Sequence, residues 1–103
     1  MDKQYVDSLM RDRGFTRYAS MGANVLQFVS AHMYTMNNTK PVVNIIVYLD
    51  TDEFKCIYNV PKSINTLESP KCGSFINDKH FFAIANKLTT VATLIEDYYN
   101  DNH

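Results

Sequence analysis

Glycine is scarce in this chain, with three residues among 103. Loops that cradle phosphate groups need closely spaced glycines, and the sequence contains no GxGxxG or P-loop pattern. The GxSxG motif that presents a nucleophilic serine is missing as well. These absences remove the common nucleotide-binding and hydrolase motifs, and we expect a protein that is not an enzyme.

Cysteine and histidine are also few. Cys56 and Cys72 form no CxxC pair, and His32, His80 and His103 share no metal-ligand spacing with each other or with a cysteine. We therefore expect no metal, no cofactor and two reduced thiols, with Cys56 in the core and Cys72 in an exposed loop. His80 and Cys72 remain the residues on which any enzymatic interpretation would depend.

Neither sign of charge dominates, because ten Lys and Arg residues face eleven Asp and Glu residues, for a net charge of −1. No global field therefore draws the protein to a polyanion. The longest apolar run, Ile45 to Leu49, is far shorter than the roughly 20 residues that span a bilayer. The charged N-terminus lacks the apolar centre of a secretory signal, so we expect a soluble, cytoplasmic protein.

The strongest structural signal is the stretch from Val42 to Val60. Two runs rich in β-branched and aromatic residues flank a polar break at residues 50–53, which is typical of a β-hairpin. Val25 to Met36 alternates with apolar residues on both faces and predicts a strand before the hairpin. Together these segments form an antiparallel meander of three strands, and Phe15 to Met21 or Ser74 to Ile76 would supply a fourth.

Two segments have the apolar spacing of helices. Asp2 to Arg13 carries a short stripe followed by Gly14, and a longer helix begins at Asn77 or Asp78 and ends near Tyr99. The apolar stripe of the longer helix is Phe81, Ile84, Ala85, Leu88, Val91, Ala92, Ile95 and Tyr98. Between hairpin and helix, Pro61 to Asn77 predicts a long loop that holds either one helical turn near residues 64–68 or the short edge strand.

The chain is long enough for one core and too short for two. We therefore predict a single α+β domain over residues 1–103. The apolar stripe of the long helix must be buried, and the meander is the surface available to it. The fold class is a two-layer sandwich with a short N-terminal helix, an antiparallel meander of three to four strands, and a long C-terminal helix packed on the sheet.

The share of tyrosine and methionine is high, with seven and five residues, and both types are favoured at protein interfaces. If only one sheet face is covered by a helix, Val42, Ile46, Tyr48 and Ile57 are exposed on the other face. The alternative is that the short N-terminal helix covers that face. We predict binding of another protein, of unknown identity, through Tyr48, Ile57, Ile46 and Tyr34. An exposed sheet face or edge also predicts a homodimer.

The residues identify no family. Small, nearly neutral α+β chains without motifs and rich in Asn, Tyr, Lys and Met resemble orphan proteins of phages and mobile elements, including anti-CRISPR proteins and other defence inhibitors. That resemblance implies an inhibitor of a host or defence protein that acts by occlusion rather than by chemistry.

An alternative is a nucleic-acid-binding domain. The predicted order of helix, three strands and helix is similar to that of double-stranded-RNA-binding domains. Their lysine cluster is replaced by the sequence NDKHF at residues 77–81, and their Gly-Pro-x-His loop by NNTKP at residues 37–41. Such binding would therefore need a local basic patch. It would be led by Lys3, Arg11, Arg13 and Arg17, and extended by Lys40, Lys62 and Lys71.

Overall fold

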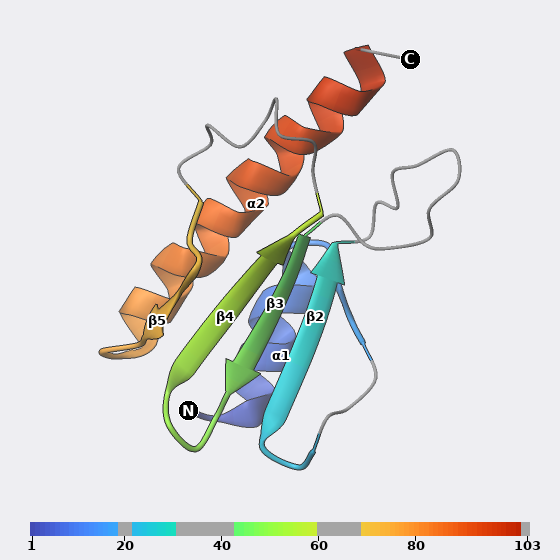
Figure 1. The fold of residues 1–103 in the computed structure, drawn as a ribbon. Coiled ribbons are helices and arrows are strands. Elements are labelled where there is room, and N and C mark those ends of the chain that lie inside the picture. Colours follow the sequence, from blue (N-terminus) through green and yellow to red (C-terminus); the bar gives the residue numbers. More distant parts are fainter. Residues whose placement is uncertain (19–21, 31–42, 60–68, 102–103) are drawn as a thin grey trace.

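A computed structural model describes residues 1–18, 22–30, 43–59 and 69–101. Two helices enclose a run of strands along the chain, which confirms the predicted α+β class (Figure 1). The elements are α1 (Lys3–Asp12), β1 (Phe15–Arg17), β2 (Val25–Ser30), β3 (Val43–Tyr48), β4 (Glu53–Tyr58), β5 (Cys72–Ser74) and α2 (Asp78–Asp101).

The strands form one antiparallel sheet in the order β1-β2-β3-β4-β5, so each strand pairs with the next one along the chain. The predicted meander is confirmed and extends to five strands, because a three-residue strand is added at each edge. The predicted continuation of β2 to Met36 and the predicted helical turn at residues 64–68 lie outside the described residues.

The register assigns alternate residues to two faces. Phe28 lies opposite Ile45, and Ile45 lies opposite Cys56, so these side chains share one face, here called the inner face. The buried apolar residues of the inner face on the three longest strands are Leu26, Phe28, Val43, Ile45, Val47, Phe54 and Cys56. The opposite, outer face carries Val25, Gln27, Val29, Asn44, Ile46, Tyr48, Glu53, Lys55 and Ile57.

Helix α2 begins where the sequence predicts. The side chain of Asn77 accepts a hydrogen bond from the backbone N–H of His80 at 2.9 Å, as an N-cap does. The core side chains that α2 contributes are Phe81, Ile84, Ala85, Leu88, Val91 and Ile95. The apolar stripe of α2 is therefore packed on the inner face of the sheet, as predicted.

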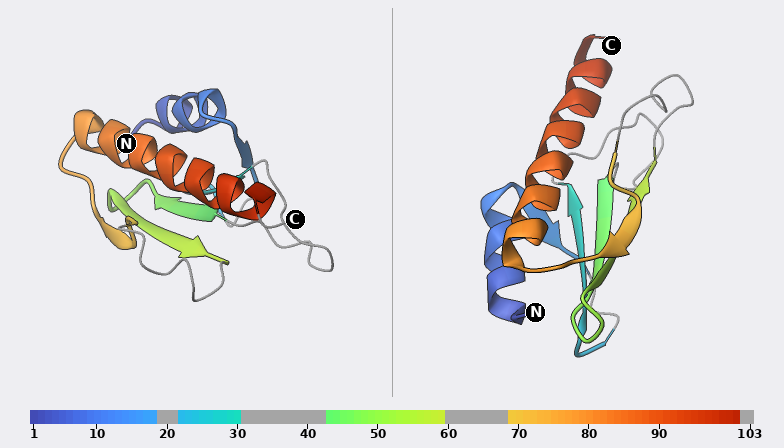
Figure 2. Two further views of the ribbon diagram at one scale, coloured as in Figure 1. Left: turned by 90° about the horizontal axis from the view of Figure 1, so that it is seen from above. Right: turned by 90° about the vertical axis from the view of Figure 1, so that its left-hand side faces the viewer.

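Helix α1 lies on the same side of the sheet as α2, so the molecule has two layers (Figure 2). Val6, Leu9 and Met10 of α1 belong to the same core cluster as the inner-face strand residues. Arg13 follows α1 and ties it to α2, with Nε donating to Asn86 Oδ1 at 2.9 Å and the guanidinium 4.7 Å from the centre of the Phe82 ring. The suggestion that the N-terminal helix covers the outer face is wrong.

Candidate functional site

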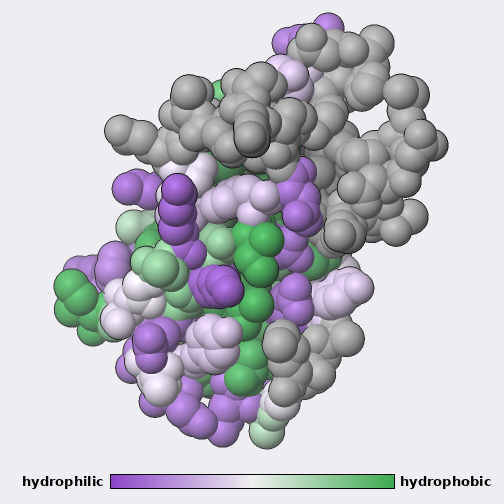
Figure 3. Space-filling model, viewed as in Figure 1, coloured by the Kyte–Doolittle hydropathy of each residue, from purple (hydrophilic) through white to green (hydrophobic). Residues whose placement is uncertain are grey.

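Three of the four predicted partner-binding residues share the outer face. The register places Ile46 and Tyr48 on β3 and Ile57 on β4, all on the side away from both helices. Tyr34, the fourth, lies outside the described residues. Figure 3 looks onto the outer face and shows apolar side chains along its middle with hydrophilic ones on either side.

The apolar residues of the outer face differ in their exposure. Ile57 is 37% exposed and Tyr48 is partly exposed, whereas Ile46 is only 8% exposed. Ile46 is flanked across the strands by Gln27 and Lys55, whose side chains stand on the same face within contact distance. The accessible apolar surface therefore lies at Tyr48 and Ile57, together with the partly exposed Val25 beside Tyr48. The expectation that Ile46 is exposed is wrong.

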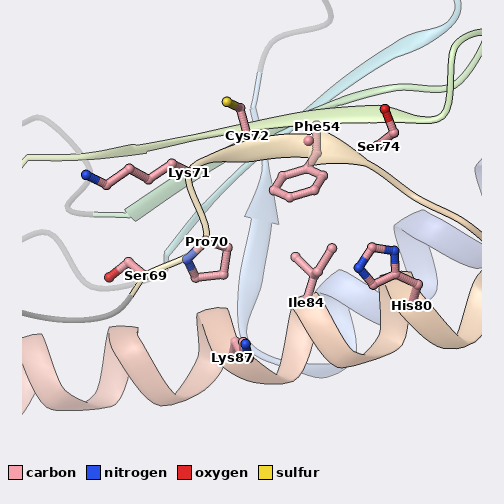
Figure 4. A pocket seen from close by; sticks show the side chains of 10 residues that line it. Phe54, Ser69, Pro70, Lys71, Cys72, Ser74, His80, Ile84 and Lys87 are labelled. Carbon is pink, nitrogen blue, oxygen red and sulfur yellow. The ribbon is translucent and has the colours of Figure 1, made fainter.

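A second surface feature lies between β5 and the first turns of α2 (Figure 4). This cavity, here called the β5–α2 groove, has a volume of about 570 Å³. Its lining residues are Phe54, Ser69, Pro70, Lys71, Cys72, Gly73, Ser74, His80, Ile84 and Lys87. The long segment between hairpin and helix was the sequence signal for it, since long loops in compact domains are often functional.

The groove brings His80 and Cys72 near one another but does not pair them. Figure 4 shows the Cys72 side chain pointing away from the groove, on the other side of β5 from His80. His80 Nδ1 accepts a hydrogen bond from the backbone N–H of Ile76 at 3.2 Å, so Nε2 carries the proton of the neutral ring. A nucleophilic thiol needs a base within hydrogen-bonding reach, and this arrangement does not supply one.

The environments of Cys56 and Tyr58 keep both side chains protonated and join two segments of the chain. Burial raises the pKa of the Cys56 thiol to about 12, so it stays protonated at neutral pH. Burial also raises the pKa of Tyr58, and the Tyr58 hydroxyl donates a hydrogen bond to the carbonyl of Pro70. The two residues attach β4 to the segment that leads into β5, and neither is an activated nucleophile.

Three of the predicted basic residues, Lys3, Arg11 and Arg17, lie near Asp7, which partly neutralises them. Arg11 Nε lies 2.9 Å from Asp7 Oδ2, and Arg17 Nη1 lies 3.8 Å from Asp7 Oδ1. Arg13 is engaged with Asn86 and Phe82, which leaves Lys3 as an exposed cation near the start of α1. Lys71 is on the groove, and residues 40 and 62 lie outside the described part. Of the described basic residues, Arg13 and Lys71 therefore lie apart from the group of Lys3, Arg11 and Arg17, which has Asp7 among it.

Metal-ligating side chains do not converge in the part of the chain that the structure describes. No group of three or more His, Cys, Asp or Glu residues there could hold a metal ion. Neither described helix combines the length and apolar character that crossing a membrane requires. Comparison with models of known protein families, with curated proteins and with solved structures finds no match for this chain.

Proposed function

We propose that this protein is a non-enzymatic binding module that docks another protein on the outer face of its sheet. The observation that carries the proposal is that both helices pack on the inner face. Among the described elements, none covers the opposite face, whose accessible apolar residues are Tyr48, Ile57 and Val25. Tyr48 and Ile57 lie toward opposite ends of the face, with Lys55 and the shielded Ile46 between them, and such a mixture of apolar and polar side chains is typical of protein interfaces.

The expected partner surface is a protein surface that presents aliphatic or aromatic side chains to Tyr48 and Ile57. The outer face is close to neutral, because Glu53 and Lys55 stand on it with opposite charges. A neutral, partly apolar surface favours a protein over a polyanion. Inhibition of a host or defence protein by occlusion is the mode of action that we propose, in line with the resemblance to phage anti-CRISPR proteins.

The test is affinity capture from the native host with the wild-type chain and matched variants as baits. Tyr48→Asp and Ile57→Asp should each lose the captured protein, since interface centres concentrate binding energy in a few anchors. Thr90→Asp introduces the same charge at an exposed position on α2 and should retain it. Circular dichroism should show all baits folded. If Tyr48→Asp and Ile57→Asp both still capture the partner, the proposal is wrong.

The salt dependence of binding distinguishes this proposal from the nucleic-acid alternative, in which Lys3, Arg11 and Arg17 would contact phosphate. Phosphate-driven binding falls steeply between low and moderate salt, whereas binding through Tyr48 and Ile57 should persist. His80→Ala and Cys72→Ala should leave capture unchanged, because neither residue lies on the outer face's apolar part. Localisation in the cytoplasm stays a prediction. Formation of a homodimer also stays a prediction, and the mass measured by light scattering tests it.

A further inference from the structure

We propose that the β5–α2 groove binds an extended acidic peptide, which adds to β5 as a further strand of the sheet. This site is separate from the outer-face surface around Tyr48 and Ile57, and the proposal does not depend on the function proposed above. Four observations support it: the hydrogen-bonding pattern of β5, the shape of the groove, the contacts that hold its walls, and its charge.

The first observation is that β5 presents an unpaired backbone edge. Cys56 N–H donates to the Lys71 carbonyl at 2.6 Å, and Phe75 N–H donates to the Asp52 carbonyl at 2.6 Å. In an antiparallel pair the hydrogen-bonded residues alternate, so Lys71, Gly73 and Phe75 face β4. The N–H and C=O groups of Cys72 and Ser74 therefore point outward, and within the described ranges no residue is hydrogen-bonded to them.

The second observation is that this edge borders a groove of suitable shape. His80, Ile84 and Lys87 recur at helical spacing on α2 and form the wall opposite β5 (Figure 4). Phe54 points into the groove from the neighbouring strand. The volume of about 570 Å³ lies within the range of ligand-binding clefts. A strand between an edge and a helix is one of the recurring modes of peptide recognition.

The third observation is that both walls are held in place. Tyr58 and Cys56 bind the Pro70 and Lys71 carbonyls at one end. At the other end the Phe75 ring stacks on Phe54 with centroids 4.9 Å apart and meets Phe81 edge-on at 4.8 Å. A groove that is already formed lowers the entropic cost of binding.

The fourth observation is the charge of the groove. Lys71 and Lys87 line it and are exposed, and its lining residues include no carboxylate. Neither lysine forms an ion pair with any residue in the described part of the chain. Next to His80, the side chain of Ile76 is 85% exposed and offers an apolar contact beyond the end of β5. The complementary occupant is a strand with acidic and β-branched residues in alternation.

Amide hydrogen exchange by NMR tests the backbone pairing on the wild-type protein. The probe is a short acetylated peptide of alternating glutamate and valine, with a lysine–valine peptide as its charge-reversed control. Without peptide, the amides of Cys72 and Ser74 should exchange fast and that of Gly73 slowly, because only Gly73 faces β4. The acidic peptide should slow exchange at Cys72 and Ser74 by about tenfold or more, and the basic peptide should not.

Two pairs of variants test the backbone and charge contributions by titration calorimetry. Ser74→Pro removes an outward N–H without removing a bond to β4, so it should weaken peptide binding about tenfold, whereas Ser74→Ala should bind as the wild type does. Lys87→Glu should weaken binding about threefold to tenfold. Lys79→Glu makes the same change on α2 outside the groove and should have no such effect.

Three results would overturn the proposal. The first is no change in Cys72 and Ser74 exchange at saturating acidic peptide, a measurement that does not depend on any variant. The second is equal affinity for the acidic and basic peptides. The third is protection of these amides in the free protein with a dimeric mass by light scattering, which would assign the edge to a second copy of the chain.

Discussion

The two faces of the sheet are built from the same strands and have opposite roles. The inner-face residues of β2, β3 and β4 are almost all apolar and pack against both helices. The outer face alternates apolar residues with Gln27, Asn44 and Lys55. Yet Ile46 on the outer face is as buried as Cys56 on the inner face, with 8% of each residue exposed. Low exposure on a central strand can therefore come from neighbouring side chains as well as from a covering helix.

The reactivity of the two cysteines gives the most direct comparison of the faces, since Cys56 is buried on the inner face and Cys72 is exposed on the outer face. A thiol reagent at neutral pH should modify Cys72 and leave Cys56 unmodified in the folded protein. The raised pKa of Cys56, from 9.0 to about 12, lowers its thiolate fraction about a thousandfold, and burial adds to the protection.

Mass spectrometry of digested protein at successive times gives the two modification rates, and the same reaction in denaturant is the control, where the rates should converge. Equal rates in the folded protein would show that Cys56 is accessible to the reagent. That result would contradict the assignment of Cys56 to the inner face of the sheet.

Two leucines on α2 allow the same comparison of a buried and an exposed side chain in the helical layer. Leu88 is fully buried against the inner face, whereas Leu94 is 47% exposed on the same helix. Leu88→Ala should lower the free energy of unfolding by about 2 to 5 kcal/mol through lost burial and a residual cavity. Leu94→Ala should change it by less than about 0.5 kcal/mol, as a surface substitution does.

Urea denaturation measures both values under the same conditions. Similar losses in the two variants would mean that α2 packs on the sheet in another rotation than the one described.

The pH dependence of stability gives the smallest expected effect. Burial raises the pKa of Cys56 from 9.0 to about 12 and raises that of Tyr58 as well, so the folded state holds both protons more tightly than the unfolded state. Their contribution is fully present below about pH 9 and is lost as the pH rises from there toward the folded-state values. Cys56 alone should contribute a loss of at most about 1.4 kcal/mol per pH unit.

Denaturation midpoints at several pH values between neutral and alkaline give this slope. Cys56→Ala isolates the thiol, because the variant should lose less stability per pH unit than the wild type while the other titrating groups stay the same. An identical slope in the two proteins would contradict the burial of Cys56.

Local sequence pattern was enough to predict much of the fold. The spacing of Phe81, Ile84, Leu88, Val91 and Ile95 predicts α2 and its buried face, and the alternation in β3 and β4 separates their two faces, because both periodicities follow from backbone geometry alone. The sequence of β2 is apolar on both faces, so its inner face was not predicted. The buried Cys56 was predicted for the same reason. The start of α2 was predicted at Asn77 or Asp78, and the structure assigns the cap to Asn77.

The candidate sites depend on contacts between segments that are distant in the sequence. The outer-face set of Ile46, Tyr48 and Ile57 was predicted, but not that Ile46 would be shielded, since its exposure depends on Gln27 and Lys55 on other strands. The β5–α2 groove was not predicted, because the three residues of β5 are too few to show a period.

The sequence by itself determined the element types, the inner-face residues of β3 and β4, and the absence of the common catalytic motifs, because these depend on local periodicity and residue chemistry. Only the tertiary structure decided that α1 joins α2 on one side, that Cys72 and His80 point apart, and that the outward groups of β5 border a cationic groove. These features depend on register and packing across long chain separations, which short-range patterns do not encode.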